Sequence, residues 1–233
     1  MRSVLCYGDS NTWGYKPAQI HQRFQPHERW PGVLRLALGE KWMVIEEGLA
    51  GRTTVHDDPI EGAEKNGRTY LRPCLQSHRP LDLAIVMLGT NDLKARFNSS
   101  VFEISMGIAA LVGDIKEARP GPNETIPEIL VVSPPPIRED LGQWQDLFQG
   151  GWSKSLQLAQ AYRRIADQHE VHFFDAGSVV HPSAEDGTHL DREGHFALGN
   201  AIAEEVESIG WFDASQSVAR PLTLHVPKHS GEK

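Results

Sequence analysis

The stretch RSVLCYGDSN, residues 2–11, places an apolar run directly before four residues that favour turns. The run predicts a short buried strand. Gly, Asp, Ser and Asn end strands because they tolerate turn geometry or hydrogen-bond their own backbone. Taken alone, the stretch favours the simple interpretation of a strand that ends. The alternative is that Ser10 is displayed at the carboxyl edge of a sheet, where open α/β proteins place their chemistry.

Strand and helix patterns alternate along the rest of the chain. The apolar runs bounded by turn residues predict strands at 2–7, 42–47, 81–88, 128–133 and 171–175. Helical spacing predicts helices at 30–39, 101–118, 153–169 and 191–208, and a further one at 66–79 that Pro73 should end or kink. This alternation predicts an α/β fold, a three-layer, doubly wound, flavodoxin-like domain with a five-stranded parallel sheet.

The chain length indicates one domain. Its 233 residues fit a single α/β domain with an ample core, which we place at 1–212, followed by a polar tail or arm at 213–233. The segment 133–152 falls outside the alternating pattern and is unusually apolar for a connection, with Trp144, Leu147, Phe148 and Trp152. Such a segment indicates either a contact with another subunit or a lid over its own domain.

The composition argues against several classes of partner. With 31 Asp and Glu against 23 Lys and Arg, the formal charge is −8, so we expect neither a nucleic acid nor a membrane surface as partner. Every apolar run is far shorter than the roughly 20 residues that cross a bilayer. The first residues contain no long apolar segment, so we expect a cytoplasmic protein in which Cys6 and Cys74 are reduced core thiols.

The carboxyl ends of the predicted strands bring four segments to one edge of the sheet, at 8–11, 48–54, 89–92 and 186–195. Ser10 is the candidate nucleophile, and a serine hydroxyl needs an adjacent base. His189 follows Asp186 by three residues, close enough for the carboxylate to hold one ring nitrogen while the other faces the serine. His195 falls inside the last predicted helix, where we interpret it as structural or partly exposed.

Two residues can supply donors for a developing oxyanion: Asn91 through its side-chain amide and Gly51 through its backbone N–H. Their alternatives are a helix cap for Asn91 and a tight turn for Gly51. Asp92 is a candidate helix N-cap without a chemical role, and Asp9 is expected to brace the turn through backbone N–H groups. Trp13 either lines the substrate pocket or belongs to the core.

These segments resemble a known superfamily. GDSNTWG (8–14), the glycine of GLAGRTT (48–54), GTND (89–92) and DGTH (186–189) match, in order, the four sequence blocks of the SGNH hydrolases, also called GDSL esterases. More narrowly, CYGDSNTWGY, EEGLAGRTT, LGTND, VVSPPP and FFDAGSV resemble the small bacterial arylesterases and acyltransferases of that superfamily, whose members also perform perhydrolysis.

The resemblance implies roles for individual residues. It implies Ser10 as nucleophile, His189 as base, Asp186 as the acid that orients it, and an oxyanion hole from the N–H groups of Ser10 and Gly51 with the Asn91 side chain. It further implies hydrolysis of short-chain aryl or small alkyl esters through an acyl-enzyme, acyl transfer to alcohols or peroxide, and a homo-oligomer larger than a dimer. We expect a small-molecule ester as substrate, with no metal ion and no cofactor.

Three other functions remain open from the sequence. Carbohydrate O-deacetylation would use the same residues. A metal-dependent phosphoesterase would use Asp9, Asn91, Asp92, His189 and His195, although the chain has no H-E-x-x-H, Cys-x-x-Cys or Walker pattern. A binding module on the same scaffold would need none of this chemistry. The chain also lacks a G-x-S-x-G elbow, which argues against the α/β-hydrolase fold.

Overall fold

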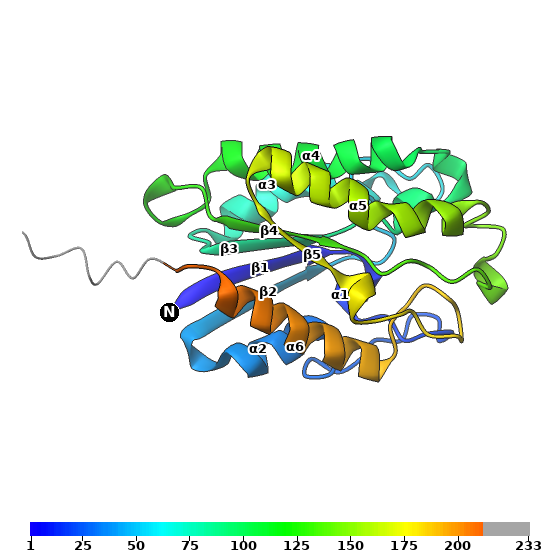
Figure 1. The fold of residues 1–233 in the computed structure, drawn as a ribbon, viewed down its shortest axis with the longest axis horizontal. Helices are drawn as coiled ribbons and strands as arrows, with labels where there is room; N and C mark the ends of the chain where they lie inside the picture. The colour runs from blue at the N-terminus through cyan, green and yellow to red at the C-terminus, as the bar shows by residue number, and fades with distance from the viewer. Residues whose placement is uncertain (212–233) are drawn as a thin grey trace, which may run out of the picture.

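A single parallel sheet organises the molecule. The computed structural model describes residues 1–211 (Figure 1), so the predicted tail at 213–233 lies outside the described residues. The sheet has the strand order β2-β1-β3-β4-β5, and every neighbouring pair is parallel. The strands are β1 Arg2–Gly8, β2 Trp42–Gly48, β3 Leu83–Met87, β4 Glu128–Ser133 and β5 His172–Asp175. The predicted five-stranded, doubly wound fold is confirmed.

Helices cover both faces of the sheet (Figure 1). One face carries α2 (Trp30–Leu38) and α6 (Arg192–Ser208). The other carries α3 (Gly67–His78), α4 (Val101–Ala118) and α5 (Gly151–His169). The four-residue helix α1 (Ser10–Trp13) directly follows β1 and belongs to neither helical layer. None of the helices between residues 1 and 211 combines the length and the apolar character needed to cross a membrane.

The interior strand β1, between β2 and β3, contributes to two separate cores. Leu5 and Tyr7 pack with α3, α4 and α5, while Val4 and Cys6 pack on the opposite face with α2 and α6. All four side chains are fully buried, because a strand in the middle of a parallel sheet is covered on both faces. This explains the continuous apolar run in the sequence. Cys6 and Cys74 are both buried and free, in agreement with reduced core thiols.

Pro73 does not end helix α3, which was one of the two outcomes that the sequence predicted. The helix is continuous from Gly67 to His78 with Pro73 inside. Proline removes the hydrogen bond that the Thr69 carbonyl would otherwise accept, but Pro73 and Thr69 are both exposed, so water can replace it. The helix gains from the N-cap, where Asn66 accepts from two backbone N–H groups, and from its buried inner face.

The first helix, α1 (Ser10–Trp13), lies directly against the ends of β1 and β2. Gly8 and Gly48 are partners in the parallel register. A Cβ on Gly48 would overlap the backbone of Thr12 and Trp13, and a Cβ on Gly8 would overlap Thr12 and a backbone oxygen of β3. The two glycines therefore allow the helix to touch the sheet without intervening side chains, which places Ser10 at the sheet edge.

This close contact predicts that Gly48→Ala is strongly destabilising. The added methyl group collides with backbone that cannot move without displacing α1, so we expect the free energy of unfolding to fall by about 3 kcal/mol. Urea unfolding followed by circular dichroism measures the change.

Gly113→Ala is the matched control. Gly113 lies within α4, and a Cβ there would meet no atom within 4 Å. Alanine is the better helix former, so this variant should gain about 1 kcal/mol. Equal stabilities of the two variants would contradict the proposed packing of α1 on the sheet.

Candidate active site

Ser10, His189 and Asp186 form one hydrogen-bonded chain. Ser10 is the first residue of α1, whereas Asp186 and His189 belong to the loop that precedes α6. The Ser10 Oγ lies 3.0 Å from His189 Nε2, and His189 Nδ1 lies 2.7 Å from Asp186 Oδ2. The three residues that the sequence selected are thus brought together, although Ser10 lies 179 positions before His189. Their arrangement is that of a nucleophile, a base and the carboxylate that orients the base.

Asp186 is held as a buried anion. It is 1% exposed, and its oxygens accept from the backbone N–H groups of Thr188, His189 and Ala18 at 3.0, 2.9 and 3.1 Å. Burial alone would raise the pKa of this carboxyl, but the hydrogen bonds and charge of His189 and the backbone donors outweigh it and lower the pKa to about 2. The carboxylate therefore stays ionised at neutral pH and fixes the orientation of the imidazole.

Two further residues position Ser10, His189 and Asp186 relative to one another, and the sequence analysis did not single them out. Asn11 donates from Nδ2 to the Thr188 carbonyl at 3.1 Å and accepts at Oδ1 from the Leu190 N–H at 2.9 Å. The residue beside the nucleophile thus clamps the backbone on both sides of His189. The ring of Tyr15 stacks on the imidazole, with centroids 4.3 Å apart. The only sequence signal for either residue is its closeness to Ser10.

The three predicted oxyanion donors face one cavity. Ser10, Gly51 and Asn91 all line it. Among the described residues, the N–H groups of Ser10 and Gly51 donate to no other group. Asn91 gives one amide hydrogen to the Arg52 carbonyl at 3.1 Å, and its second hydrogen is free for the cavity. Gly51 has a φ of +83°, a conformation that favours glycine, so the turn interpretation and the donor interpretation both hold for it.

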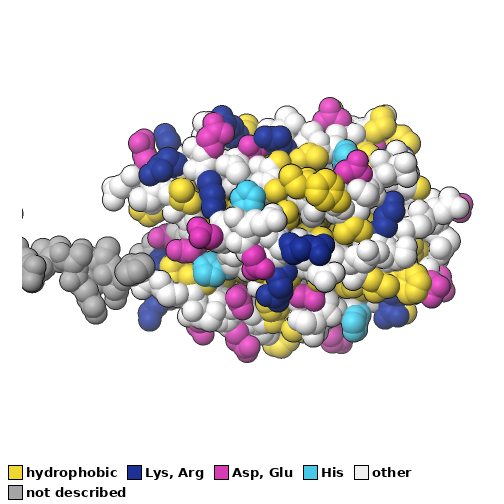
Figure 2. Space-filling model, turned by 45° about the horizontal axis from the view of Figure 1, so that its top comes forward, with side chains coloured by type: hydrophobic (Ala, Val, Ile, Leu, Met, Phe, Trp, Pro, Cys, Tyr) yellow, Lys and Arg dark blue, Asp and Glu magenta, His cyan; other side chains and the backbone are white. Residues whose placement is uncertain are grey.

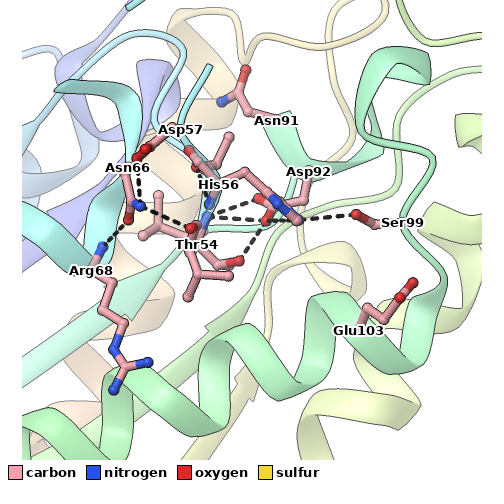
Figure 3. Close-up of polar contacts among 12 residues, drawn as sticks. Thr54, His56, Asp57, Asn66, Arg68, Asn91, Asp92, Ser99 and Glu103 are labelled. Atoms are coloured by element: carbon pink, nitrogen blue, oxygen red, sulfur yellow. Dashed lines mark hydrogen bonds and ion pairs between the residues drawn. The ribbon is translucent and has the colours of Figure 1, made fainter. Parts of the chain in front are cut away.

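Asp92 joins the loops that carry these donors, and it is not the helix N-cap that we expected. Ser100 caps α4 instead. The Asp92 carboxylate, fully buried, accepts from the Thr54 N–H at 3.0 Å and from its hydroxyl at 2.5 Å (Figure 3). Asp92 directly follows Asn91, and Thr54 is three residues beyond Gly51. The contact therefore ties together the loops that carry two of the candidate oxyanion donors.

The cavity has a volume of about 360 Å³ and also receives part of the apolar segment 133–152. Trp144, Leu147 and Phe148 line it, so this part of the segment folds over its own domain. Trp13 is not among the lining residues. It is half-buried, with the Arg23 guanidinium 4.9 Å from its ring centre.

The residues proposed for a metal-dependent phosphoesterase do not all converge: Asn91 and His189 line the cavity, whereas Asp9, Asp92 and His195 do not. His195 is fully buried, and its Nδ1 accepts from the Trp30 N–H at 3.3 Å, away from the residues that line the cavity. Burial lowers its pKa to about 3, so the imidazole is neutral. The Asp92 carboxylate already accepts two hydrogen bonds from Thr54. His195 is thus structural, as the first of our two interpretations had it.

Another group of residues has the ligand types that a metal ion takes. Within residues 1–211, atoms of Glu47, Cys74 and His78 lie within 4.8 Å of one another, outside the cavity. His78 Nε2 is already paired with the Glu47 carboxylate at 2.7 Å. Burial, followed by the Glu47 charge, raises the pKa of the Cys74 thiol to about 12, so it is protonated at neutral pH. The group is accounted for as a hydrogen-bonded pair of side chains, Glu47 and His78, beside a core thiol.

Asp9 braces the turn as predicted, but at an electrostatic cost. Its Oδ1 accepts from the Asn11 N–H at 3.0 Å, whereas its Oδ2 is buried and has no partner among the described residues. Burial raises the pKa of this carboxyl to about 6, although the Asn11 N–H acts in the opposite direction.

Asp9→Asn should therefore remove part of the pH dependence of stability. The raised pKa means that the native state holds the Asp9 proton more tightly than the unfolded chain does, so stability is lost as pH rises from about 4 to about 6. At neutral pH the loss amounts to about 3 kcal/mol. Urea unfolding at several pH values should show the wild type losing stability relative to Asp9→Asn within this window.

Asp186→Asn provides the opposite case. The lowered pKa of Asp186 stabilises the native state above about pH 4, and this contribution is lost as pH falls through about 2. Its pH-dependent difference from the wild type should thus develop below pH 4. A wild-type curve parallel to that of Asp9→Asn between pH 4 and 6 would contradict the account of Asp9.

Comparisons with known proteins place this geometry in a family. The model of the GDSL-like lipase/acylhydrolase family matches residues 6–197. A search of the curated proteins found no match. Among solved structures, an aryl esterase of M. smegmatis is 44% identical with a TM-score of 0.85, over 89% of this chain and 99% of that chain. Est24, described as a carbohydrate acetylesterase from Sinorhizobium meliloti, is 42% identical with a TM-score of 0.85, over the same shares of the two chains.

A third structure agrees with these two. It is described as a putative arylesterase from Agrobacterium tumefaciens and is 40% identical with a TM-score of 0.81, over 90% of this chain and all of that chain. The family match covers most of the chain, and the three relatives are aligned over nearly their whole length. The chain therefore belongs to the GDSL-like lipase/acylhydrolase family and is a carboxylic ester hydrolase.

Proposed function

We propose that the protein hydrolyses short-chain esters of aryl or small alkyl alcohols through an acyl-enzyme on Ser10. The observation that supports this most is the 3.0 Å contact between Ser10 Oγ and His189 Nε2, in a cavity that also receives the oxyanion donors. A serine in hydrogen-bond contact with a base that a carboxylate orients is equipped for nucleophilic attack on a carbonyl carbon.

The reaction follows from these contacts. Ser10 Oγ attacks the ester carbonyl carbon while its proton passes to His189 Nε2. The charge that develops on the carbonyl oxygen is stabilised by the N–H groups of Ser10 and Gly51 and by the Asn91 amide. When the tetrahedral intermediate collapses, the bond to the alcohol breaks and the alcohol oxygen takes the proton from His189. Water then repeats the sequence on the acyl-enzyme and releases the acid.

The preference for short chains is supported by the size and lining of the cavity. Its volume of about 360 Å³ lies at the lower end for small-molecule sites. Trp144, Leu147 and Phe148 supply large side chains from one segment, and Phe148 is only 5% exposed. Such a wall suits a short acyl group and a planar or small alcohol.

Ser10→Ala should abolish turnover without unfolding the protein. The substitution removes the nucleophile and leaves the hydrogen bonds of Asp9 and Asn11 in place. Intact-mass spectrometry after treatment with a fluorophosphonate should give a single adduct on the wild type and none on the variant. Hydrolysis of p-nitrophenyl acetate should be faster than that of longer-chain p-nitrophenyl esters.

Asp186→Asn is the companion variant. It keeps the shape of the site but loses the charge that orients His189, so its rate should fall by about 10²- to 10⁴-fold while the adduct still forms slowly. Full activity of Ser10→Ala would refute the scheme.

We further propose that the protein forms a homo-oligomer and transfers acyl groups to alcohols or peroxide. Hydrophobic side chains gather on the face that carries α4 and α5 (Figure 2). The exposed apolar residues there are Phe102 and Met106 on α4 and Trp152 and Leu156 on α5. Because α5 starts directly after the segment that lines the cavity, a neighbouring subunit on this face would lie close to the entrance and exclude water.

The ratio of transfer products to acid tests this second proposal. With p-nitrophenyl acetate and ethanol, the assembled enzyme should form more ethyl acetate per acetate than the dissociated enzyme at the same concentration of active sites. Size-exclusion chromatography establishes the two states. Equal ratios would remove the link between assembly and transfer.

Removal of acetyl groups from a carbohydrate is the second candidate function. It would use the same reaction, and the Est24 structure, 42% identical, is described as a carbohydrate acetylesterase. The polar part of the cavity favours it, because Glu61, Lys65 and Lys94 line the cavity together with the apolar segment.

A further inference from the structure

One carboxylate lines the cavity without a role in the proposed reaction. Glu61 belongs to the connection between β2 and α3, and its side chain is about a third exposed, at 34%. Ser10, His189 and Gly51 line the same cavity. A charged side chain beside a reacting ester is costly unless something fixes it and uses it.

A network of charges fixes the Glu61 side chain. Its Oε1 accepts from Lys94 Nζ at 2.6 Å and from Arg96 Nη2 at 2.7 Å. The same two cations lie 3.6 and 3.5 Å from Asp58 Oδ2. Asp58 in turn accepts at Oδ1 from the backbone N–H groups of Ile60 and Glu61.

This network is preorganised because most of it is buried. The side chains of Lys94 and Asp58 are 3% and 0% exposed. Burial by itself raises the pKa of Asp58, but the backbone N–H groups and the two cations outweigh it, so the pKa is lower than usual. The Glu61 carboxylate is thus held in one orientation, unlike a surface side chain that samples several.

The second oxygen of Glu61 is available to a ligand. Oε2 accepts no hydrogen bond from any described residue. It lies beside the oxyanion glycine, because a Cβ built on Gly51 would be 2.5 Å from it. This contact is a second reason, besides the backbone conformation, for glycine at position 51. An acceptor oxygen therefore stands next to the site where the ester carbonyl binds.

The chemistry of this oxygen selects its ligand. A carboxylate accepts hydrogen bonds and donates none, so its partner must bring an O–H or N–H group. The two carboxylates Asp58 and Glu61 are balanced by the two cations Lys94 and Arg96, and the nearby Lys65 is paired with Glu64 at 3.8 Å, so the subsite carries little net charge. A neutral hydroxyl group fits this oxygen best.

We propose that Glu61 Oε2 is a hydroxyl-binding subsite for the alcohol part of the substrate, which makes partly acylated polyols or sugars the preferred esters. This inference rests on the proposed function. The proposed acyl group is a short alkyl chain without a hydroxyl, so the hydroxyl belongs to the alcohol part. Glu61 takes no part in proton transfer; it binds the hydroxyl and orients the ester.

A pair of esters that differ only at the hydroxyl tests the subsite. In 2-methoxyethyl acetate a methyl ether replaces the hydroxyl of 2-hydroxyethyl acetate, and p-nitrophenyl acetate serves as a reference without either group. The wild type should favour the hydroxy ester in kcat/KM by about tenfold or more, as expected for a hydrogen bond to a charged acceptor. No preference in the wild type would overturn the inference, whether or not any variant folds.

Glu61→Gln and Glu64→Gln form a matched pair of variants. Glu64 is a nearby carboxylate, 65% exposed, and it does not line the cavity. Glu61→Gln should bring the ratio of kcat/KM for the hydroxy ester to that for the methoxy ester close to one, because an uncharged amide replaces the carboxylate acceptor. Glu64→Gln should keep the wild-type ratio. If Glu61→Gln lowered kcat/KM by the same factor for all three esters, Glu61 would only support the structure of the site, and the subsite proposal would be overturned.

The two proposals fail in different ways. If the proposed function is wrong, hydrolysis of p-nitrophenyl acetate will survive Ser10→Ala. If only the subsite is wrong, hydrolysis will depend on Ser10 and the ratio of the two acetates will be the same in Glu61→Gln and the wild type.

Discussion

The direct contact of helix α1 with the sheet is the constraint on which the site depends. Gly8 and Gly48 stand side by side at the ends of β1 and β2, and neither has room for a side chain under the helix. This close packing fixes the distance between α1 and the ends of the two strands. The position of Ser10 is fixed in the same way, because it is the first residue of the helix. Its backbone N–H has no acceptor within the helix.

The strand order then decides which groups meet Ser10. Because β1 lies between β2 and β3, the loops that follow all three strands adjoin, and they carry Ser10, Gly51 and Asn91. His189 comes from a distant part of the chain and has no strand to place it. The Asn11 side chain performs this task by bonding the backbone on both sides of the histidine. The proposed nucleophile and its proposed base are thus positioned by adjacent residues of one helix.

The sequence predicted what depends on local pattern. The strands and long helices follow from apolar periodicity, and the positions of Ser10, Asp186 and His189 follow from short motifs. It could not predict contacts that depend on tertiary neighbours. Asp92 resembled a helix cap until its carboxylate was found against Thr54, 38 residues away. Pro73 was expected to break its helix, and its exposed position could not be known before the packing of α3 was.

Three carboxylates in and near the site differ in their hydrogen-bond partners and therefore in their properties. Asp186 is surrounded by donors and has a pKa of about 2, whereas Asp9 has one unpaired buried oxygen and a pKa of about 6. Both are 1% exposed, but Asp9 is enclosed more completely by protein and accepts from one N–H group, whereas Asp186 accepts from His189 and from three backbone N–H groups. Glu61 is a third case, with one oxygen neutralised by Lys94 and Arg96 and the other turned to the cavity. This last arrangement suits the proposed binding of a substrate hydroxyl, because the bonded oxygen holds the side chain in place and the other oxygen keeps its full capacity to accept hydrogen bonds.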